Sequence, residues 1–215
     1  MISTKERVAI VLPKGRTLGE ACNLFQKAGL LAEPVDENSR RLVFDGTQEK
    51  IKFLLIRDTD IPTYVEYGAC DMGVVGKDHL AEQEKDVYEP LDLKFGFCRL
   101  VVAEPDALRK KDDPALWSHI RIATKFPRVT EKYFQAKGIQ VEIIKLYGSI
   151  ELAPLAGLSE RIVDLVSTGQ TLRQNGLVEV EEIMKVTSRL IVNRASLKTK
   201  NAIIKEIIDK LKEQL

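Results

Sequence analysis

The sequence predicts an α/β protein made of two small lobes. Apolar runs of strand length alternate along its 215 residues with longer segments whose apolar residues recur at helical spacing. This strand–helix cycle occurs twice, and the second cycle begins near residue 95. We therefore expect residues 1–94 and 184–215 to form lobe I and residues 95–183 to form lobe II. Ligands in such folds bind where strands end or between lobes, so functional residues are expected in the turns that follow strands.

Lobe I is expected to begin with a buried strand over residues 8–12. The segment Thr17-Leu-Gly-Glu20 then predicts a capping box, in which the two polar side chains bind the first free N–H groups of a helix that ends near Gly29. Further strands are expected over residues 41–44, 52–56 and 71–76, with a helix between the last two that Asp60 caps and Gly68 ends.

The last part of the chain is expected to return to lobe I. A late strand is predicted over residues 186–193, followed by an amphipathic helix over residues 200–215. Its stripe of isoleucines and leucines, from Ile203 to Leu215, is expected to pack on lobe I.

Lobe II is expected to open with a strand over residues 95–103 and a polar loop around Pro105, Asp106 and residues 109–114. Strands over residues 120–124, 141–145 and 161–166 should alternate with helices over residues 127–137, 149–155 and 171–175. Gly138 and Gly176 follow two of these helices, where glycine is a typical helix stop.

Composition sets several classes of protein aside. The 33 Lys and Arg residues nearly balance the 32 Asp and Glu residues, a charge that does not favour nucleic acid as a partner. The apolar run after the N-terminal polar residues is short and no run is as long as a membrane span, so we expect a cytoplasmic protein. The cysteines and histidines lack metal-ligand spacing and are expected to be structural: Cys22, Cys70, Cys98, His79 and His119.

The sharpest functional pattern is the segment from Asp164 to Leu172, which runs from a predicted strand directly into a helix start. Its hydroxyl groups, its glycine and the free N–H groups of the helix start suit a phosphate. It has no lysine to complete a nucleoside-triphosphatase loop, so a monophosphate beside an acid that accepts ribose hydroxyls fits better. By its residues alone, the segment is equally typical of a capped turn. The loop residues are Ser167, Thr168, Gly169, Gln170, Thr171 and Leu172.

Two cationic turns also follow predicted strands. Lys14 and Arg16 flank Gly15 just before a helix, where an anion is favoured, and Arg57 and Asp58 follow the strand over residues 52–56. Taken alone, these could be an exposed basic turn and a surface ion pair.

The segment from Glu151 to Leu172 resembles the signature of the ATP phosphoribosyltransferase family. That signature begins with a Glu, followed after five residues by a Gly and then by a small residue. An aliphatic residue comes next, two positions before an Asp. The signature ends with Ser/Thr-Gly-x-Thr-Leu/Met. It is filled here by Glu151, Gly157, Ser159, Ile162, Asp164, Thr168, Gly169, Thr171 and Leu172. Three upstream segments are also similar to the family: the one around Lys14, the one with Arg57 and Pro62, and the one from Asp71 to Lys77. The resemblance therefore spans residues 8–196.

The resemblance implies a fold, a reaction and a partner. The fold is two α/β lobes like those of type II periplasmic binding proteins, with the active site in the cleft between them. The reaction joins N1 of ATP to the ribose of phosphoribosyl pyrophosphate (PRPP), and pyrophosphate leaves with Mg²⁺, which the substrate diphosphate holds rather than direct protein ligands. The chain is similar to the short form of the family. It is therefore expected to be a homodimer that joins a larger assembly with a regulatory subunit resembling a histidyl-tRNA synthetase, which binds histidine.

The same resemblance implies residue roles. The loop from Ser167 to Leu172 would hold the 5-phosphate of PRPP, Asp164 the ribose hydroxyls, and Glu151 the ribose or a proton. The ATP and pyrophosphate phosphates would meet Lys14, Gly15, Arg16, Arg57 and Asp58. Arg40 matches an arginine that enters the site from the neighbouring subunit, and Arg16, Arg40 and Asp164 would carry catalysis.

Two other functions compete with this interpretation. A non-catalytic small-molecule binding protein could have the same two-lobed fold, but it would require export. An ordinary nucleobase phosphoribosyltransferase usually has two adjacent acids before its phosphate loop, whereas here Leu165 follows Asp164.

Overall fold

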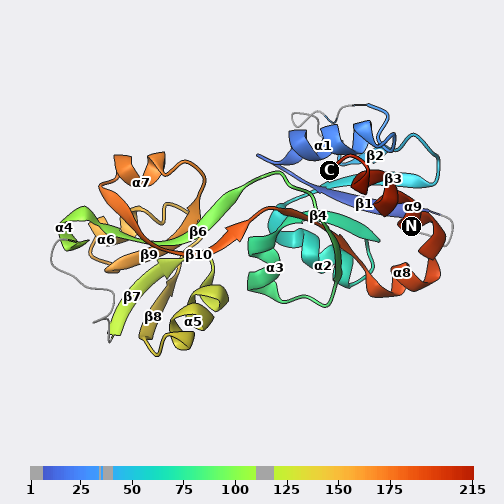
Figure 1. Ribbon diagram of the computed structural model, residues 1–215. Helices are drawn as coiled ribbons and strands as arrows, with labels where there is room; N and C mark the ends of the chain where they lie inside the picture. Colours follow the sequence, from blue (N-terminus) through green and yellow to red (C-terminus); the bar gives the residue numbers. More distant parts are fainter. Residues whose placement is uncertain (1–6, 34, 36–40, 110–118) are drawn as a thin grey trace. The chain divides into compact units, whose positions relative to one another are not determined.

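The computed structural model describes residues 7–33, 35, 41–109 and 119–215, which form two compact α/β units (Figure 1). Unit 1 comprises Met1–Gly96 and Thr187–Leu215, and unit 2 comprises Phe97–Val186. The α/β class predicted from the sequence is confirmed. Unit 2 is thus a continuous stretch of chain inserted into unit 1.

The sheet of unit 1 has the strand order β2-β3-β1-β4-β11-β5. Its strands are β1 (Val8–Pro13), β2 (Val43–Asp45), β3 (Ile51–Ile56), β4 (Met72–Gly76), β5 (Tyr88–Asp92) and β11 (Ser188–Val192). Strand β1 is parallel to both β3 and β4, so these three strands end at the same edge of the sheet. Strand β11, the last strand in the chain, is antiparallel and lies between β4 and β5.

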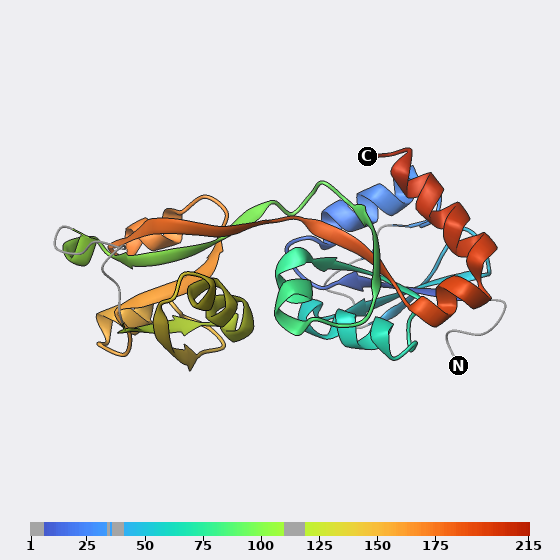
Figure 2. The same ribbon diagram turned by 60° about the horizontal axis from the view of Figure 1, so that its bottom comes forward.

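Helices cover both faces of this sheet (Figure 2). Helices α1 (Leu18–Lys27) and α9 (Asn201–Lys212) pack on one face, and α2 (Ile61–Glu66) and α3 (Lys77–Gln83) pack on the other. Strand β1 lies between the two layers and is buried along its whole length, which explains its unbroken apolar sequence. A short 3₁₀ turn, η1 (Asp58–Asp60), precedes α2, and α8 (Arg194–Thr199) precedes α9.

The sheet of unit 2 has the strand order β10-β6-β9-β7-β8. Its strands are β6 (Cys98–Pro105), β7 (His119–Thr124), β8 (Gln140–Lys145), β9 (Arg161–Val166) and β10 (Leu177–Val186). Helix α5 (Pro127–Ala136) packs on one face, while α6 (Leu152–Leu155) and α7 (Gln170–Gln174) pack on the other; α4 (Asp106–Arg109) follows β6. Strands β7, β8 and β9 are parallel and end at one edge.

Local capping was predicted wrongly at two helices. Neither Thr17 before α1 nor Asp60 before α2 forms a side-chain cap hydrogen bond, so the capping box is absent. Backbone geometry explains this, because neither residue has the extended conformation that lets a cap side chain fold back: Thr17 has φ −95° and ψ 0°, and Asp60 has φ −96° and ψ −19°.

The sequence pattern also did not predict α3, β5, α8, β10, helix α4 or the 3₁₀ turn η1. In β10, glutamates interrupt the apolar pattern because this strand lies at the edge of the sheet and is only partly buried. The strand predicted over residues 186–193 instead divides between the end of β10 and β11. The loop predicted around Pro105 and Asp106 contains helix α4, and most of residues 109–114 lie outside the described residues.

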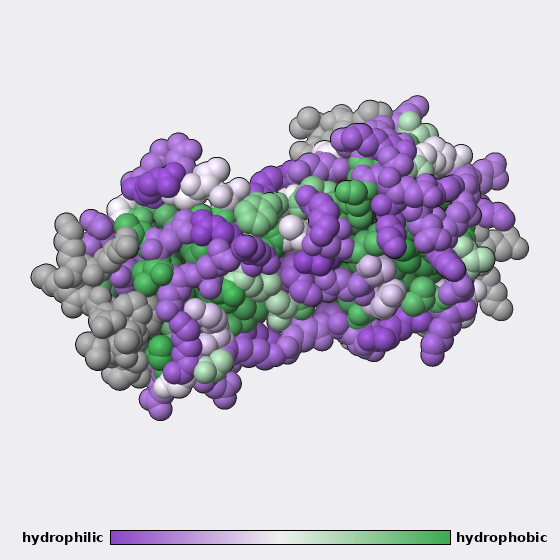
Figure 3. Space-filling model, in the orientation of Figure 1, coloured by the Kyte–Doolittle hydropathy of each residue, from purple (hydrophilic) through white to green (hydrophobic). Residues whose placement is uncertain are grey.

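Hydrophilic side chains cover most of the face of unit 1 seen in Figure 3. No helix in the described part of the chain is long and apolar enough to cross a membrane.

The aliphatic stripe of α9 packs on unit 1, as predicted from its spacing, but Leu215 lies beyond the helix and is exposed, against the prediction. Ile204, Ile207 and Leu211 are buried in the same core cluster as Phe25 of α1 and Phe53 of β3. The helix therefore contributes to the stability of unit 1.

We predict that Ile207→Ala lowers the free energy of unfolding by about 3 kcal/mol, because it leaves a cavity where a side chain only 1% exposed had packed. Lys205→Ala, at an exposed position of the same helix, is the matched control and should change stability by less than about 0.5 kcal/mol. Urea unfolding measures both. An equal decrease in the free energy of unfolding in the two variants would show that the stripe is not part of the hydrophobic core.

Candidate functional site

The cationic turns of unit 1 lie side by side at the edge where parallel strands end. The backbone N–H of Lys14, after β1, donates to the carbonyl oxygen of Ile56 at the end of β3, with 2.9 Å between the two atoms. Arg57 follows Ile56 directly, and the side chains of Lys14 and Arg57 are both exposed. The structure thus brings together two cations that are 43 positions apart in the sequence (57 − 14 = 43).

A pocket of about 480 Å³ lies beside these turns along α1. Gly15 and Arg16 form one end of it, and Gly15 has φ +99°, a conformation that favours glycine. The remaining lining is apolar or uncharged: Leu18, Gly19, Cys22, Asn23, Gln26 and Val35. Arg16 is therefore an exposed cation in the lining of a pocket whose other lining residues are uncharged.

Asp58 is held by a histidine that the sequence did not connect with it. The Nε2 atom of His79 on α3 lies 3.4 Å from Oδ2 of Asp58 and 3.7 Å from Oδ2 of Asp78. The hydrogen bond with His79 is the main cause that lowers the pKa of Asp58. Burial acts to lower the pKa of His79, but the bond to Asp58 and the charges of Asp78, Asp58 and Glu82 raise it overall.

A second pocket, of about 190 Å³, lies at the end of β9 in unit 2. Its lining contains every residue that the sequence assigned to PRPP, together with Leu165 and Val166: Glu151, Asp164, Ser167, Thr168, Gly169, Gln170, Thr171 and Leu172. The side chains of Ser167, Thr168, Gln170 and Thr171 are exposed, while Leu172 is buried and anchors the loop in the core. Hydroxyl groups are thus available to a ligand on a loop with a fixed base.

Asp164 lies in this pocket beside charges of both signs. Burial is the main cause that raises the pKa of its carboxyl group. The N–H of Leu165, which donates to Oδ1 of Asp164 at 2.9 Å, and the charge of Lys125 act to lower that pKa, whereas Glu151 acts to raise it. A partly buried carboxylate of this kind interacts strongly with any positive charge that develops next to it.

Gly169 gives the loop its turn. It has φ +72°, and an added Cβ would lie 3.1 Å from Oε1 of Glu179 and 3.3 Å from Nη1 of Arg173. A side chain at this position would therefore be strained in its backbone and crowded by charged groups.

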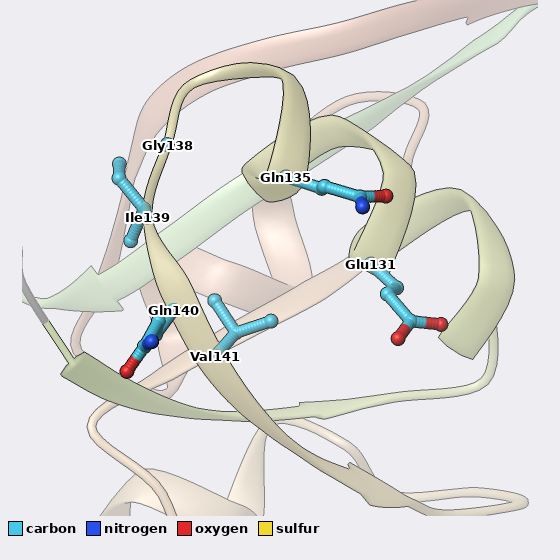
Figure 4. Close-up of a pocket in the computed structure, with 6 residues that line it drawn as sticks. All are labelled: Glu131, Gln135, Gly138, Ile139, Gln140 and Val141. Carbon is cyan, nitrogen blue, oxygen red and sulfur yellow. The ribbon is translucent and has the colours of Figure 1, made fainter.

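A third hollow, of about 440 Å³, lies between α5 and β8 (Figure 4). Its lining has one carboxylate and no cation: Glu131, Gln135, Gly138, Ile139, Gln140 and Val141. This lining does not favour a phosphorylated ligand.

One residue predicted from the sequence falls outside these groups, and one residue was missed. Arg40 lies outside the described residues. Lys125 was missed, although it follows β7 as directly as Lys14 follows β1, which is the signal that would have identified it.

Carboxylates that could hold a metal ion together with a substrate lie in the pocket at the end of β9. They are those of Glu151 and Asp164. Among the residues that the structure describes, no group of three or more His, Cys, Asp or Glu side chains could hold a metal ion. Mg²⁺ commonly combines one or two carboxylates with substrate phosphates.

Comparison with known proteins gives consistent results. The family model described as ATP phosphoribosyltransferase (HisG) matches residues 57–213. The ATP phosphoribosyltransferase of Geobacter metallireducens is 64% identical over 208 residues, covering 97% of this chain and 98% of the relative. ATP phosphoribosyltransferase 2 of Geobacter sulfurreducens is 63% identical with the same coverage.

Solved structures agree with the sequence relatives. A chain of the ATP phosphoribosyl transferase (HisG:HisZ) complex from Thermotoga maritima matches with a TM-score of 0.81 and 34% identity, over 96% of this chain and 98% of that chain. The periplasmic aliphatic sulphonate binding protein SsuA from Escherichia coli matches with a TM-score of 0.59 and 13% identity, over 97% of this chain and 72% of that chain. The second match shows a shared fold, that of a two-lobed binding protein, and nothing more.

We predict that His79→Gln lowers the free energy of unfolding by about 0.5 kcal/mol near pH 5.5 and by much less near pH 9. The folded pKa of His79 is raised, so its stabilisation is fully present below the unfolded pKa of about 6.5 and is lost as pH rises through the folded value. The lowered pKa of Asp58 adds stability that is lost as pH falls below about 4.

Urea unfolding of His79→Gln, Asp58→Asn and the double variant at about pH 5.5 and pH 9 tests the pair. Near pH 5.5 the second substitution should cost less in the background of the first than alone. Additive losses that do not depend on pH would contradict the ion pair.

Proposed function

Because the chain belongs to the ATP phosphoribosyltransferase family, we propose that its two groups of polar loops bind the two substrates of that family's reaction. The enzyme transfers the 5-phosphoribosyl group of PRPP to N1 of ATP and releases pyrophosphate, which is the first step of histidine biosynthesis. Both substrates are polyanions, so each requires donors and cations to replace its water.

We assign the 5-phosphate of PRPP to the loop from Ser167 to Leu172. The observation that carries this assignment is the pocket at the end of β9, whose lining includes all the residues that the family resemblance assigned to PRPP. Backbone N–H groups and hydroxyls of a strand-to-helix loop bind phosphate without a lysine. Glu151, on the same pocket wall, is a candidate ligand of the ribose or a general base.

Asp164 is the proposed partner of the ribose. Its carboxylate accepts hydrogen bonds from the ribose hydroxyls and opposes the positive charge that builds on the ring as pyrophosphate departs. Because this carboxylate is partly buried, its field is weakened less by water than that of a surface acid.

The cationic turns of unit 1 are the proposed site of the ATP or pyrophosphate phosphates. Lys14, Gly15, Arg16 and Arg57 offer exposed donors at one sheet edge, and fixed cations there stabilise the charge that collects on the leaving pyrophosphate. Asp58 is held by His79, so we expect it to position the turn that carries Arg57. The role of Arg40 across a subunit boundary stays a prediction from the family resemblance.

The reaction requires a divalent metal ion. We propose that this ion is Mg²⁺, which shields the diphosphate of PRPP as it becomes the leaving group. Glu151 and Asp164 are the carboxylates in the pocket at the end of β9 that could bind waters of such an ion.

We also propose that the chain works as a short-form catalytic subunit in the cytoplasm. Support comes from its 34% identity to a chain of the Thermotoga maritima HisG:HisZ complex, which it covers almost completely. By that likeness, its partner resembles HisZ. The family resemblance further implies that this partner is similar to a histidyl-tRNA synthetase and that the catalytic chain forms a homodimer within the larger assembly. A purely ligand-binding role is disfavoured, because the family model and the relatives of 63–64% identity are ATP phosphoribosyltransferases.

We predict that Asp164→Asn lowers kcat by about 100- to 1000-fold while the protein stays folded, because the amide keeps the shape but loses the charge that opposes the cationic ribose. Initial rates of phosphoribosyl-ATP formation from ATP, PRPP and magnesium measure the effect. Asp209→Asn, on the exposed face of α9, is the control and should leave the rate unchanged. Near-normal turnover in Asp164→Asn would contradict a role for the carboxylate.

We predict that the purified chain is active and insensitive to histidine until the synthetase-like subunit is added. An effector inhibits only through a state to which it binds differently, so sensitivity should appear together with the subunit that binds histidine. The measurement is initial rate against histidine concentration, with and without the partner. Saturable inhibition of the chain alone would place a histidine site within these 215 residues.

A further inference from the structure

An arginine on α7 contacts the backbone of the loop from Ser167 to Leu172, which we call the phosphate loop. Nη2 of Arg173, on α7, donates to the backbone carbonyl oxygen of Thr168 at 3.0 Å. Nη1 of the same guanidinium lies 3.3 Å from the position that a Cβ on Gly169 would occupy. Arg173 therefore contacts the two residues at the centre of the loop through one rigid, planar group.

An ion pair lies beside the same side of Gly169. Oε1 of Glu179, on β10, lies 3.1 Å from the same Cβ position. Glu179 is held by Arg99 of β6, whose Nη1 lies 2.7 Å from Oε2 and whose Nη2 donates to Oε1 at 3.1 Å. Arg99 is the register partner of Val166, the residue directly before the loop. The acid beside the loop is thus paired with a cation, which reduces its repulsion of a bound phosphate.

These contacts matter because the centre of the loop has little support besides the buried Leu172 at its end and a hydrogen bond of 3.4 Å from the N–H of Gln170 to Oγ1 of Thr168. Ser167, Thr168 and Gln170 are exposed, α7 has five residues, and Gly169 at its start forms no side-chain cap. Ordering such a loop on binding would cost backbone conformational entropy. A loop already held in the binding conformation avoids that cost, so its ligand binds more tightly.

We infer that Arg173, together with the Arg99–Glu179 ion pair, is a positioning residue that fixes the backbone of Thr168 and Gly169 and thereby sets the affinity of the loop for the 5-phosphate of PRPP. The residue acts through the loop, because its guanidinium donates to a backbone carbonyl oxygen of the loop. The donors that meet an anion at such a loop are its own backbone N–H groups. This inference rests on the proposed assignment of PRPP to this loop.

The test compares Arg173→Ala with Gln174→Ala, a control at the next, exposed position of the same helix. For Arg173→Ala we expect the KM for PRPP to rise about tenfold, with kcat and the KM for ATP changed less than about twofold. A tenfold change corresponds to about 1.4 kcal/mol, within the range of a hydrogen bond from a charged donor. Gln174→Ala should leave all three constants unchanged.

A salt series separates positioning from a direct charge contact. Screening weakens the pull of an exposed cation on a phosphate, so a direct role predicts that the ratio of the two PRPP KM values falls towards one at about 0.5 M KCl. Positioning predicts a ratio that stays the same. A ratio that falls would overturn the inference.

Hydrogen exchange of the free protein supplies a readout that does not depend on the reaction. Amides of residues 167–171 should exchange several times faster in Arg173→Ala than in the parent chain, while those of β9 keep their rate. Unchanged loop exchange would overturn the inference whatever the kinetics. Faster exchange with an unchanged KM for PRPP would show that Arg173 stabilises the loop but that PRPP does not bind there. That result would contradict the proposed function of the loop. If Arg173→Ala does not fold, Arg173→Lys, which lacks the planar fork, is measured in its place with the same expected direction.

Discussion

One buried carboxylate, that of Asp71, holds together the discontinuous parts of unit 1. Its oxygens accept hydrogen bonds from the N–H of Ala9 at 2.8 Å, from Oγ of Ser196 at 2.6 Å, and from Nζ of Lys200 at 2.8 and 2.9 Å. Ala9 belongs to the first strand, Ser196 to α8, and Lys200 lies between α8 and α9. Removing one partner of such a pair would leave an uncompensated buried charge, at a cost of about 3–5 kcal/mol. The return of the chain to unit 1 is therefore fixed by charge as well as by apolar packing.

The candidate functional residues of both units gather mainly where parallel strands end. In unit 1 the cationic turns follow β1 and β3, and in unit 2 Lys125 and the loop from Ser167 to Leu172 follow β7 and β9. Asp164 instead lies within β9, two residues before its end. Turns at this edge suit an anionic ligand, because backbone donors are also free there.

The sequence indicates residues whose proposed role depends on their neighbours in the chain. It does not reveal residues whose role depends on contacts between segments that are far apart in the sequence. The loop from Ser167 to Leu172 is readable because a strand, small polar residues and a helix start follow one another directly. The partnership of His79 with Asp58, and that of Arg99 with Glu179 across 80 positions, exists only after the chain folds. The capping box failed for the converse reason, because the backbone of Thr17 adopts a conformation that the pattern Thr-x-x-Glu does not determine. Strand β10 was missed because the solvent-facing edge of a sheet tolerates glutamates.

The place of β11 in its sheet constrains the order in which the protein can form during synthesis on the ribosome. This strand emerges after the whole of Phe97–Val186, yet it lies between β4 and β5, which emerge long before it. Among the described strands, β5 pairs only with β11. The backbone groups of β5 therefore have no strand partner until a segment about a hundred residues later has been synthesised. Unit 2, by contrast, is complete as soon as its own continuous stretch has been translated. The inserted unit can therefore fold first, while the unit that begins the chain is the last to close, and until then its unfinished sheet edge is open to incorrect pairing.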